Sequence, residues 1–187
     1  DPNKLKALLM KKDENGWTPF DISVKYAQQN KFEAMLNLCV KLHISTDSVL
    51  ETANDENILH LAMYTDCNDD FCAHLLDLLK SKSDYLKTHI GKQNKKGYTP
   101  FDIVVINGQW NKFEAMLKLY NDLKVSEDNV LFKKTKHGEN IIHLAVNPNC
   151  DDKFFANLLH LLKSKPGKLE ALMYKKDKHN HTPFHTA

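Results

Sequence analysis

Apolar residues recur along the chain at the spacing of amphipathic helices. The run Phe32, Met35, Leu36 and Cys39 follows the i, i+3, i+4, i+7 rule, and a shorter apolar face runs through residues 20–27. A Thr-Pro step at residues 18–19 supplies an N-cap and then a proline at the first helical position, where the missing N–H costs no hydrogen bond. The pattern predicts two helices, one through residues 20–27 and one through residues 32–39, joined by a turn.

The same pattern returns several times. Residues 16–22 (GWTPFDI) recur at 97–103 (GYTPFDI) and in part at 181–185 (HTPFH), and residues 31–36 (KFEAML) recur at 112–117. A second motif, NILHLA at 57–62, matches NIIHLA at 140–145, and residues 74–82 match 157–165. Aligning Thr18, Asn57, Thr99 and Asn140 gives steps of 39, 42 and 41 residues. The repeating unit is therefore about 40 residues long, and two variants of it alternate.

Charged residues mark the expected ends of the second helices. The acidic pairs 69–70 and 151–152 precede these helices, and Lys80, Lys82, Lys163 and Lys165 follow them, which complements the helix dipole. Each unit is thus expected to consist of a helix, a turn, a helix and a long connector. The connectors at 45–55 and 126–138 begin with capping residues, so each is expected to start with a short helical turn.

These motifs resemble the ankyrin repeat family, whose signature is T-P-L-H-x-A after a D-x-x-G turn. Residues 13–20 (DENGWTPF) and 97–101 fit the turn and the cap, and residues 59–62 (LHLA) and 142–145 (IHLA) fit the remainder. Gly108 stands where the family usually has glycine between helices, whereas Asp21 and Asp102 replace the family's histidine, and the unit is longer than the family's 33 residues.

The resemblance implies an all-α, ankyrin-like helical repeat solenoid that forms one domain over residues 1–187. Its four repeats are expected at 13–54, 55–94, 95–136 and 137–178, with partial units at 1–12 and 179–187. Leu5, Leu86 and Leu169 occupy equivalent positions, so the chain is expected to begin and end inside a repeat and to be an excerpt from a longer protein.

Composition narrows the class of protein. The chain is 42% hydrophobic and 27% charged with a mean hydropathy of −0.51, which is typical of a soluble folded unit. It has no apolar run near the roughly 20 residues of a membrane span and no secretory signal pattern, so a cytosolic location is predicted. Every basic residue is lysine, and the lack of arginine argues against sequence-specific nucleic-acid recognition. The four cysteines are expected to be reduced.

Two arrangements of residues could carry chemistry. His60, Cys67, Cys72 and His74 offer four zinc ligands, but the equivalents of the last two are Phe155 and Asn157. Cys39 and His43 lie one turn apart, yet the cysteine is flanked by leucines and no third group orients the histidine. The resemblance implies instead that the repeat histidines bond to nearby backbone and turn groups. We therefore predict no catalytic residue, no metal ligand, no cofactor and no enzyme activity.

Lysines cluster just before the predicted turns. They are Lys11, Lys12, Lys95, Lys96, Lys133, Lys134 and Lys136, followed by 175, 176 and 178. Stacked units would align them along one basic edge. This edge is either a solvated rim or a surface for an acidic protein, a nucleic acid or anionic lipid head groups.

The resemblance also implies a recognition row, since the residue before each capping step and exposed positions of the first helix face a concave groove. The row comprises Trp17, Glu56, Tyr98, Glu139 and His181, with Tyr26, Tyr64 and Ile106 beside it. Tryptophan and tyrosine often anchor interfaces, although Trp17 and Tyr98 could instead brace the neighbouring turn.

The function predicted from this row is binding of a partner protein, as a scaffold or interaction module. One alternative is a targeting or regulatory segment of a larger multidomain protein, for example one that bacteria deliver into the host cytosol. The other alternative is polyanion or membrane binding through the basic edge.

Overall fold

The computed structural model describes residues 1–50, 56–165 and 167–185, and the chain divides into two compact units. Unit 1 is Asp1–Lys96 and unit 2 is Gly97–Ala187. Every regular element of the described residues is a helix, which confirms the all-α prediction.

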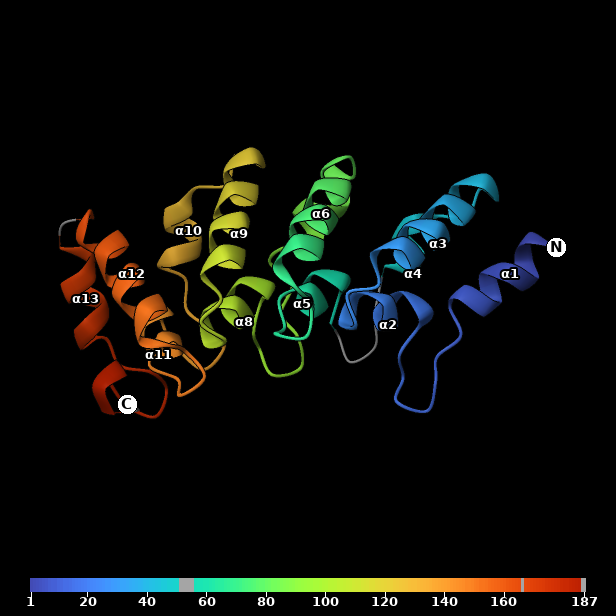
Figure 1. The fold of residues 1–187 in the computed structure, drawn as a ribbon. Helices are drawn as coiled ribbons and strands as arrows, with labels where there is room; N and C mark the ends of the chain where they lie inside the picture. Colours follow the sequence, from blue (N-terminus) through green and yellow to red (C-terminus); the bar gives the residue numbers. More distant parts are fainter. Residues whose placement is uncertain (51–55, 166, 186–187) are drawn as a thin grey trace. The chain divides into compact units, whose positions relative to one another are not determined.

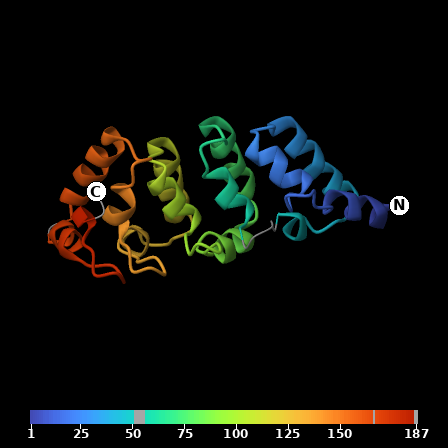
Figure 2. The same cartoon turned by 90° about the horizontal axis from the view of Figure 1, so that it is seen from below.

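After its first helix, unit 1 contains two pairs of helices, and one further helix follows each pair (Figure 1). The elements are α1 (Pro2–Leu9), α2 (Pro19–Lys25), α3 (Gln29–Lys41), α4 (Thr46–Val49), α5 (Ile58–Ala62), α6 (Asp69–Lys80) and α7 (Ser83–His89). The pairs are α2 with α3 and α5 with α6. Helix α2 packs against α3 and α5, and the long helices α3 and α6 lie side by side (Figures 1 and 2). Phe32 of α3 joins the two pairs, because its ring contacts Phe20 of α2 and Phe71 of α6.

Unit 2 repeats the order of α2 to α7 and ends with an additional 3-10 helix. It contains α8 (Pro100–Ile106), α9 (Trp110–Asp122), α10 (Glu127–Leu131), α11 (Ile141–Ala145), α12 (Asp152–Lys163), α13 (Lys168–Tyr174) and the 3-10 helix η1 (Pro183–His185). Helix α8 packs against α9 and α11, and η1 packs against α11 and α13. The long helices α9 and α12 lie side by side, as α3 and α6 do in unit 1 (Figure 2).

The first helix of each pair begins with a capping box, in which two side chains satisfy backbone N–H groups that the helix leaves unpaired. Thr18 and Asp21 form this box in α2, and Thr99 and Asp102 form it in α8. In α5 and α11 the box is formed by an asparagine and a histidine, which are Asn57 with His60 and Asn140 with His143.

The histidine boxes show how an aspartate, as in Asp21 and Asp102, can make the same capping bond as a histidine at this position. His60 accepts the N–H of Asn57 through Nδ1 (3.0 Å), and Asp21 accepts the N–H of Thr18 through Oδ2 (2.8 Å), so the two side chains do the same work. His143 likewise accepts the N–H of Asn140, and its Nε2 lies 3.1 Å from the backbone oxygen of His181. The expected bonding of the repeat histidines to backbone and turn groups is therefore confirmed.

Helices α7 and α13, which follow the pairs α5–α6 and α11–α12, were not predicted, because both segments were assigned to connectors. Each is tied to the preceding pair by the capping asparagine. The side-chain nitrogen of Asn57 donates to the backbone oxygen of His89 (2.8 Å), and that of Asn140 donates to the backbone oxygen of Leu172 (2.9 Å). The short helical turns expected in the connectors are present as α4 and α10.

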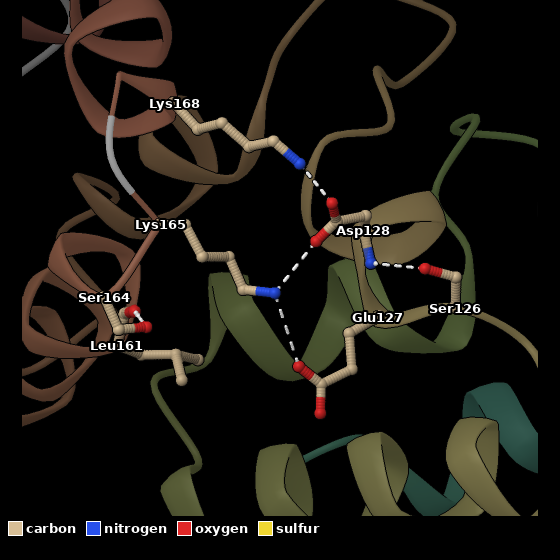
Figure 3. Close-up of polar contacts among 7 residues, drawn as sticks. All are labelled: Ser126, Glu127, Asp128, Leu161, Ser164, Lys165 and Lys168. Atoms are coloured by element: carbon tan, nitrogen blue, oxygen red, sulfur yellow. Dashed lines mark hydrogen bonds and ion pairs between the residues drawn. The ribbon is translucent and has the colours of Figure 1, made fainter.

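An ion-pair cluster fastens α10 of unit 2 to the helices that follow it (Figure 3). Lys165 Nζ lies 2.8 Å from Asp128 Oδ1 and 3.6 Å from Glu127 Oε2, and Lys168 also pairs with Asp128. Lys168 Nζ lies 4.5 Å from the centre of the Phe132 ring as well. Among the described residues, the equivalent place in unit 1 holds the pair of Asp47 with Lys82, at 3.5 Å. Lys82 and Lys165 thus contact carboxylates of α4 and α10, besides standing after the carboxyl ends of α6 and α12.

Candidate functional site

Unit 1 contains a surface groove in which several predicted recognition residues meet. One cavity of about 290 Å³ is lined by Trp17, Lys25, Glu56, Leu61, Tyr64, Thr65 and Asp66. A second cavity of about 280 Å³ shares Glu56 and Tyr64 with the first and is completed by Asn94, Lys95 and Lys96. We call these the first and the second cavity. Their lining comes from the turn before α2, the end of α2, the segment just before α5, α5 itself and the turns that follow α5 and α7.

Trp17 is held in place by the turn that precedes α2. Asp13 Oδ1 accepts the N–H groups of Asn15 (2.9 Å) and Trp17 (2.8 Å), and the Asp13 N–H donates to the Trp17 carbonyl (2.9 Å). The hydrogen bond from Trp17 and those from Asn15 hold the pKa of Asp13 below its usual value. Because the turn and the capping box fix the backbone on both sides, the half-buried indole enters the first cavity with little freedom.

Lys25 lies over the indole. Its Nζ is 4.6 Å from the centre of the Trp17 ring and 5.9 Å from that of Tyr26, both within the range of a cation–π contact. Tyr26 is 61% exposed, and its ring neighbours Lys25, which lines the first cavity. One face of Trp17 thus already binds a cation, supplied by the chain itself.

Glu56 stands where the two cavities meet. Its Oε1 accepts a hydrogen bond from the Tyr64 hydroxyl (2.7 Å) and another from Asn94 Nδ2 (3.2 Å). Burial raises the pKa of Tyr64, and so do its hydrogen bond to Glu56 and the negative charge of Glu56. The phenol therefore remains a donor at neutral pH. Two hydrogen-bond donors, both on Oε1, therefore fix the orientation of the Glu56 carboxylate.

Unit 2 contains the predicted recognition residues Tyr98, Glu139, His181 and Ile106. The half-buried Tyr98 ring lies 6.2 Å from that of His137, and its pKa is raised by burial and by Glu139, with which it is hydrogen-bonded. Glu139 Oε2 also accepts the Thr135 hydroxyl (2.9 Å). Ile106 is half-buried at the end of α8, and the exposed His181 ring stacks 6.2 Å from that of His185. A continuous row through all predicted positions remains a prediction.

Sequence reasoning missed Lys25, Leu61, Thr65, Asp66 and Asn94. One signal was present, since Ile106 was named and Lys25 is its equivalent one repeat pair earlier. Asp66 had no such signal, because a charged residue in a polar turn is most often solvated.

The lysines of the predicted basic edge are exposed, and two of them act on buried carboxyl groups. Burial raises the pKa of Asp21 and of Asp102, while the hydrogen bonds from their capping threonines oppose that rise. The positive charges of Lys12 and Lys133 oppose it too, in unit 1 and unit 2 respectively. These two lysines therefore help to accommodate the capping boxes.

The residues considered for chemistry do not converge. Cys67 and Cys72 are buried, and His74 Nε2 lies 2.6 Å from Glu33 Oε1. Within residues 1–50, 56–165 and 167–185, no three His, Cys, Asp or Glu side chains lie close enough together to hold a metal ion. Cys39 is fully buried and burial raises its thiol pKa, which disfavours the nucleophilic thiolate, whereas His43 is exposed.

None of the helices in the described part of the chain is both long and apolar enough to span a bilayer. No family model matches the chain, and no curated protein matches it.

Proposed function

We propose that this chain is an ankyrin-like repeat array that binds a partner protein through the first cavity of unit 1. Three features support the repeat architecture. Helix pairs of the same kind recur in both units, the capping boxes alternate between Thr/Asp and Asn/His, and a third helix is tied to each Asn/His box. Arrays of this kind carry their binding residues on a rigid frame of helices and turns.

The observation that carries the proposal is the pairing of Trp17 and Tyr64 in one groove with a pinned carboxylate. Aromatic side chains offer large contact areas at a small cost in conformational entropy, which is why they dominate interface hot spots. A cavity of about 290 Å³ lies at the small end of the range for ligand pockets, so it suits a side chain better than a cofactor. The groove is thus expected to receive an anchor residue of the partner.

The proposal is tested by capturing proteins from a cytosolic extract on the immobilised full chain. Three baits are compared by quantitative mass spectrometry: wild type, Trp17→Ala and Tyr174→Ala. Tyr174 is 75% exposed on α13 and lies outside the groove, so its replacement is a matched loss of one aromatic ring. True partners are retained by wild type and Tyr174→Ala and lost from Trp17→Ala.

Purified partners are then titrated against the same three chains. Removal of an anchor is expected to weaken binding by about 2 kcal/mol, or roughly thirtyfold, with unchanged helix content by circular dichroism. Equal affinity for wild type and Trp17→Ala would contradict the proposal. It would mean that Trp17 only braces its turn and that a partner docks elsewhere.

A further inference from the structure

We infer that the first cavity of unit 1 receives a basic side chain of the partner, arginine or lysine. This inference rests on the proposed function and adds the chemistry of the anchor. It follows from the state of Glu56, from the ring face of Trp17 and from the charges that line the two cavities.

Among the described residues, hydrogen-bond donors reach only one of the two carboxylate oxygens of Glu56. Both hydrogen bonds to its carboxylate, from Tyr64 and from Asn94, end on Oε1, while no described residue donates to Oε2. The two donors fix the orientation of the carboxylate before any partner arrives, which lowers the entropy cost of binding. A guanidinium or ammonium group is the natural complement of such an oriented, half-buried anion.

Trp17 provides the second half of a cation site. The 4.6 Å approach of Lys25 Nζ to the ring centre shows that this face accepts a positive charge within the groove. An incoming arginine can stack on an aromatic ring and bond to a carboxylate at the same time, because its guanidinium is planar and has five donors. Lys25 is then a competitor of the partner and also repels it.

The lining charges favour the same assignment. Among the described lining residues, Glu56 and Asp66 against Lys25 leave the first cavity with one excess negative charge, whereas the second cavity has Lys95 and Lys96 against Glu56. The basic side chain is therefore expected in the first cavity and is disfavoured in the second. An acidic side chain would instead be favoured in the second cavity and disfavoured in the first.

The test begins with a random 12-residue peptide library displayed on phage and selected on the full chain. Peptides that also bind the Trp17→Ala chain are discarded. The selected peptide is made with a fluorescent label, and a second version replaces its basic residue by citrulline, the neutral isostere of arginine. Affinities are measured by fluorescence polarisation. The selected sequences are expected to share one Arg or Lys, and citrulline is expected to weaken binding at least tenfold.

Three substitutions give the sign of the effect. Glu56→Gln keeps an acceptor for Tyr64 and Asn94 but removes the charge, and it is expected to weaken binding at least tenfold. Lys25→Met keeps the apolar stem and removes the competing ammonium, so it is expected to strengthen binding several-fold. Glu114→Gln changes an exposed carboxylate on α9 in the same way and is expected to leave the affinity unchanged.

The outcomes separate this inference from the proposed function. Peptides that depend on Trp17 but are acidic, are weakened by Lys25→Met and are unaffected by Glu56→Gln would overturn the basic anchor and leave the groove as the binding site. If no peptide remains once those that also bind the Trp17→Ala chain are discarded, the basic anchor and the proposed function are both wrong. An anchor bound through its charge also requires that the citrulline peptide lose its sensitivity to Glu56→Gln, and retained sensitivity would overturn the inference.

Discussion

The two units have the same order of helices but place their aromatic residues differently. In unit 2 the Phe113 ring lies within 5.4 Å, centre to centre, of Phe101, Trp110 and Phe154. Its equivalent in unit 1, Phe32, contacts only two rings among the described residues, those of Phe20 and Phe71. Gln29 stands in unit 1 where unit 2 has Trp110, and Cys39 stands where unit 2 has Tyr120.

At the positions of the groove, unit 1 has an aromatic side chain that unit 2 lacks. Tyr64 of unit 1 corresponds to Asn147 of unit 2, and Lys25 corresponds to Ile106. Unit 2 thus packs its additional aromatic side chains against Phe101 and Phe113, whereas the additional tyrosines of unit 1, Tyr26 and Tyr64, lie at its surface. The capping boxes are the same in both units, so they preserve the frame while core and groove positions are free to differ. This difference favours unit 1 as the binding unit.

The largest expected effect follows from the two cores. Replacing either Phe113 or Phe32 by alanine should lower the free energy of unfolding by about 3–5 kcal/mol, because both side chains are fully buried. Replacement by leucine preserves more volume, and it should cost about 1 kcal/mol more at Phe113 than at Phe32 because more ring pairs are lost.

Each unit has its own fluorescent reporter for this measurement. Trp110 reports on unit 2 in a Trp17→Phe background, and Trp17 reports on unit 1 in a Trp110→Phe background. Denaturant titration of the single-tryptophan chains gives the free energies. An equal cost of the two Phe→Leu changes would show that the aromatic cluster of unit 2 adds no stability beyond its buried area.

A smaller contrast is expected where α2 and α8 end. Both helices are followed by a residue in the left-handed region, Ala27 with φ of 50° and Gly108 with φ of 62°. A Cβ on Gly108 would lie 2.9 Å from the Cα of Cys150 and 3.0 Å from the backbone nitrogen of Asp151. Gly108→Ala should therefore cost more than the roughly 1–2 kcal/mol of the left-handed backbone alone.

The reciprocal change is the control. Ala27→Gly relieves the left-handed strain but increases the entropy of the unfolded chain, so the net change should lie within about 1 kcal/mol of zero. The same single-tryptophan denaturant titrations measure both variants. If Gly108→Ala proved as mild as Ala27→Gly, the close approach to Cys150 would have no energetic weight.

Much of this frame could be predicted from local signals. The Thr-Pro steps gave the starts of α2 and α8, because a cap is read from three or four consecutive residues. The repeat alignment of Asn57 and Asn140 with the two threonines then gave the starts of α5 and α11. The third helices could not be found in this way. Helices α7 and α13 have seven residues each, and their link to the frame is a hydrogen bond from an asparagine 32 residues earlier in the chain.

The groove was predictable in part for the same reason. Trp17 and Glu56 were named because the repeat alignment places them directly before a cap. Tyr64 was named as an exposed position of a first helix, but α5 ends at Ala62 and Tyr64 lies just after it. Lys25 was missed because a lysine in the last turn of a helix already has a local explanation in the helix dipole. Only the folded structure shows that its ammonium lies over the Trp17 ring. The role of these residues in binding stays a prediction.

The smallest expected effect concerns the charged contacts of the two short helices α4 and α10. Asp128 of unit 2 pairs with Lys165 and Lys168, and these hydrogen bonds hold its pKa below the usual value (Figure 3). A carboxyl group whose pKa is lowered by folding stabilises the folded state above its unfolded pKa of about 3.9, and this contribution disappears as the pH falls through the folded pKa.

Asp128→Asn should therefore destabilise unit 2 at pH 7 and have little effect at strongly acidic pH. Asp47→Asn should have a smaller effect at pH 7, because the Asp47 side chain is 62% exposed and has a single lysine at 3.5 Å. Both effects should shrink in high salt, since these charges are accessible to solvent. Denaturant titrations of the two variants at pH 7 and pH 3, each at low and high salt, provide the check. A cost of Asp128→Asn that did not change with pH would assign the role of this residue to packing or to neutral hydrogen bonds, and would remove charge from the contrast between the units.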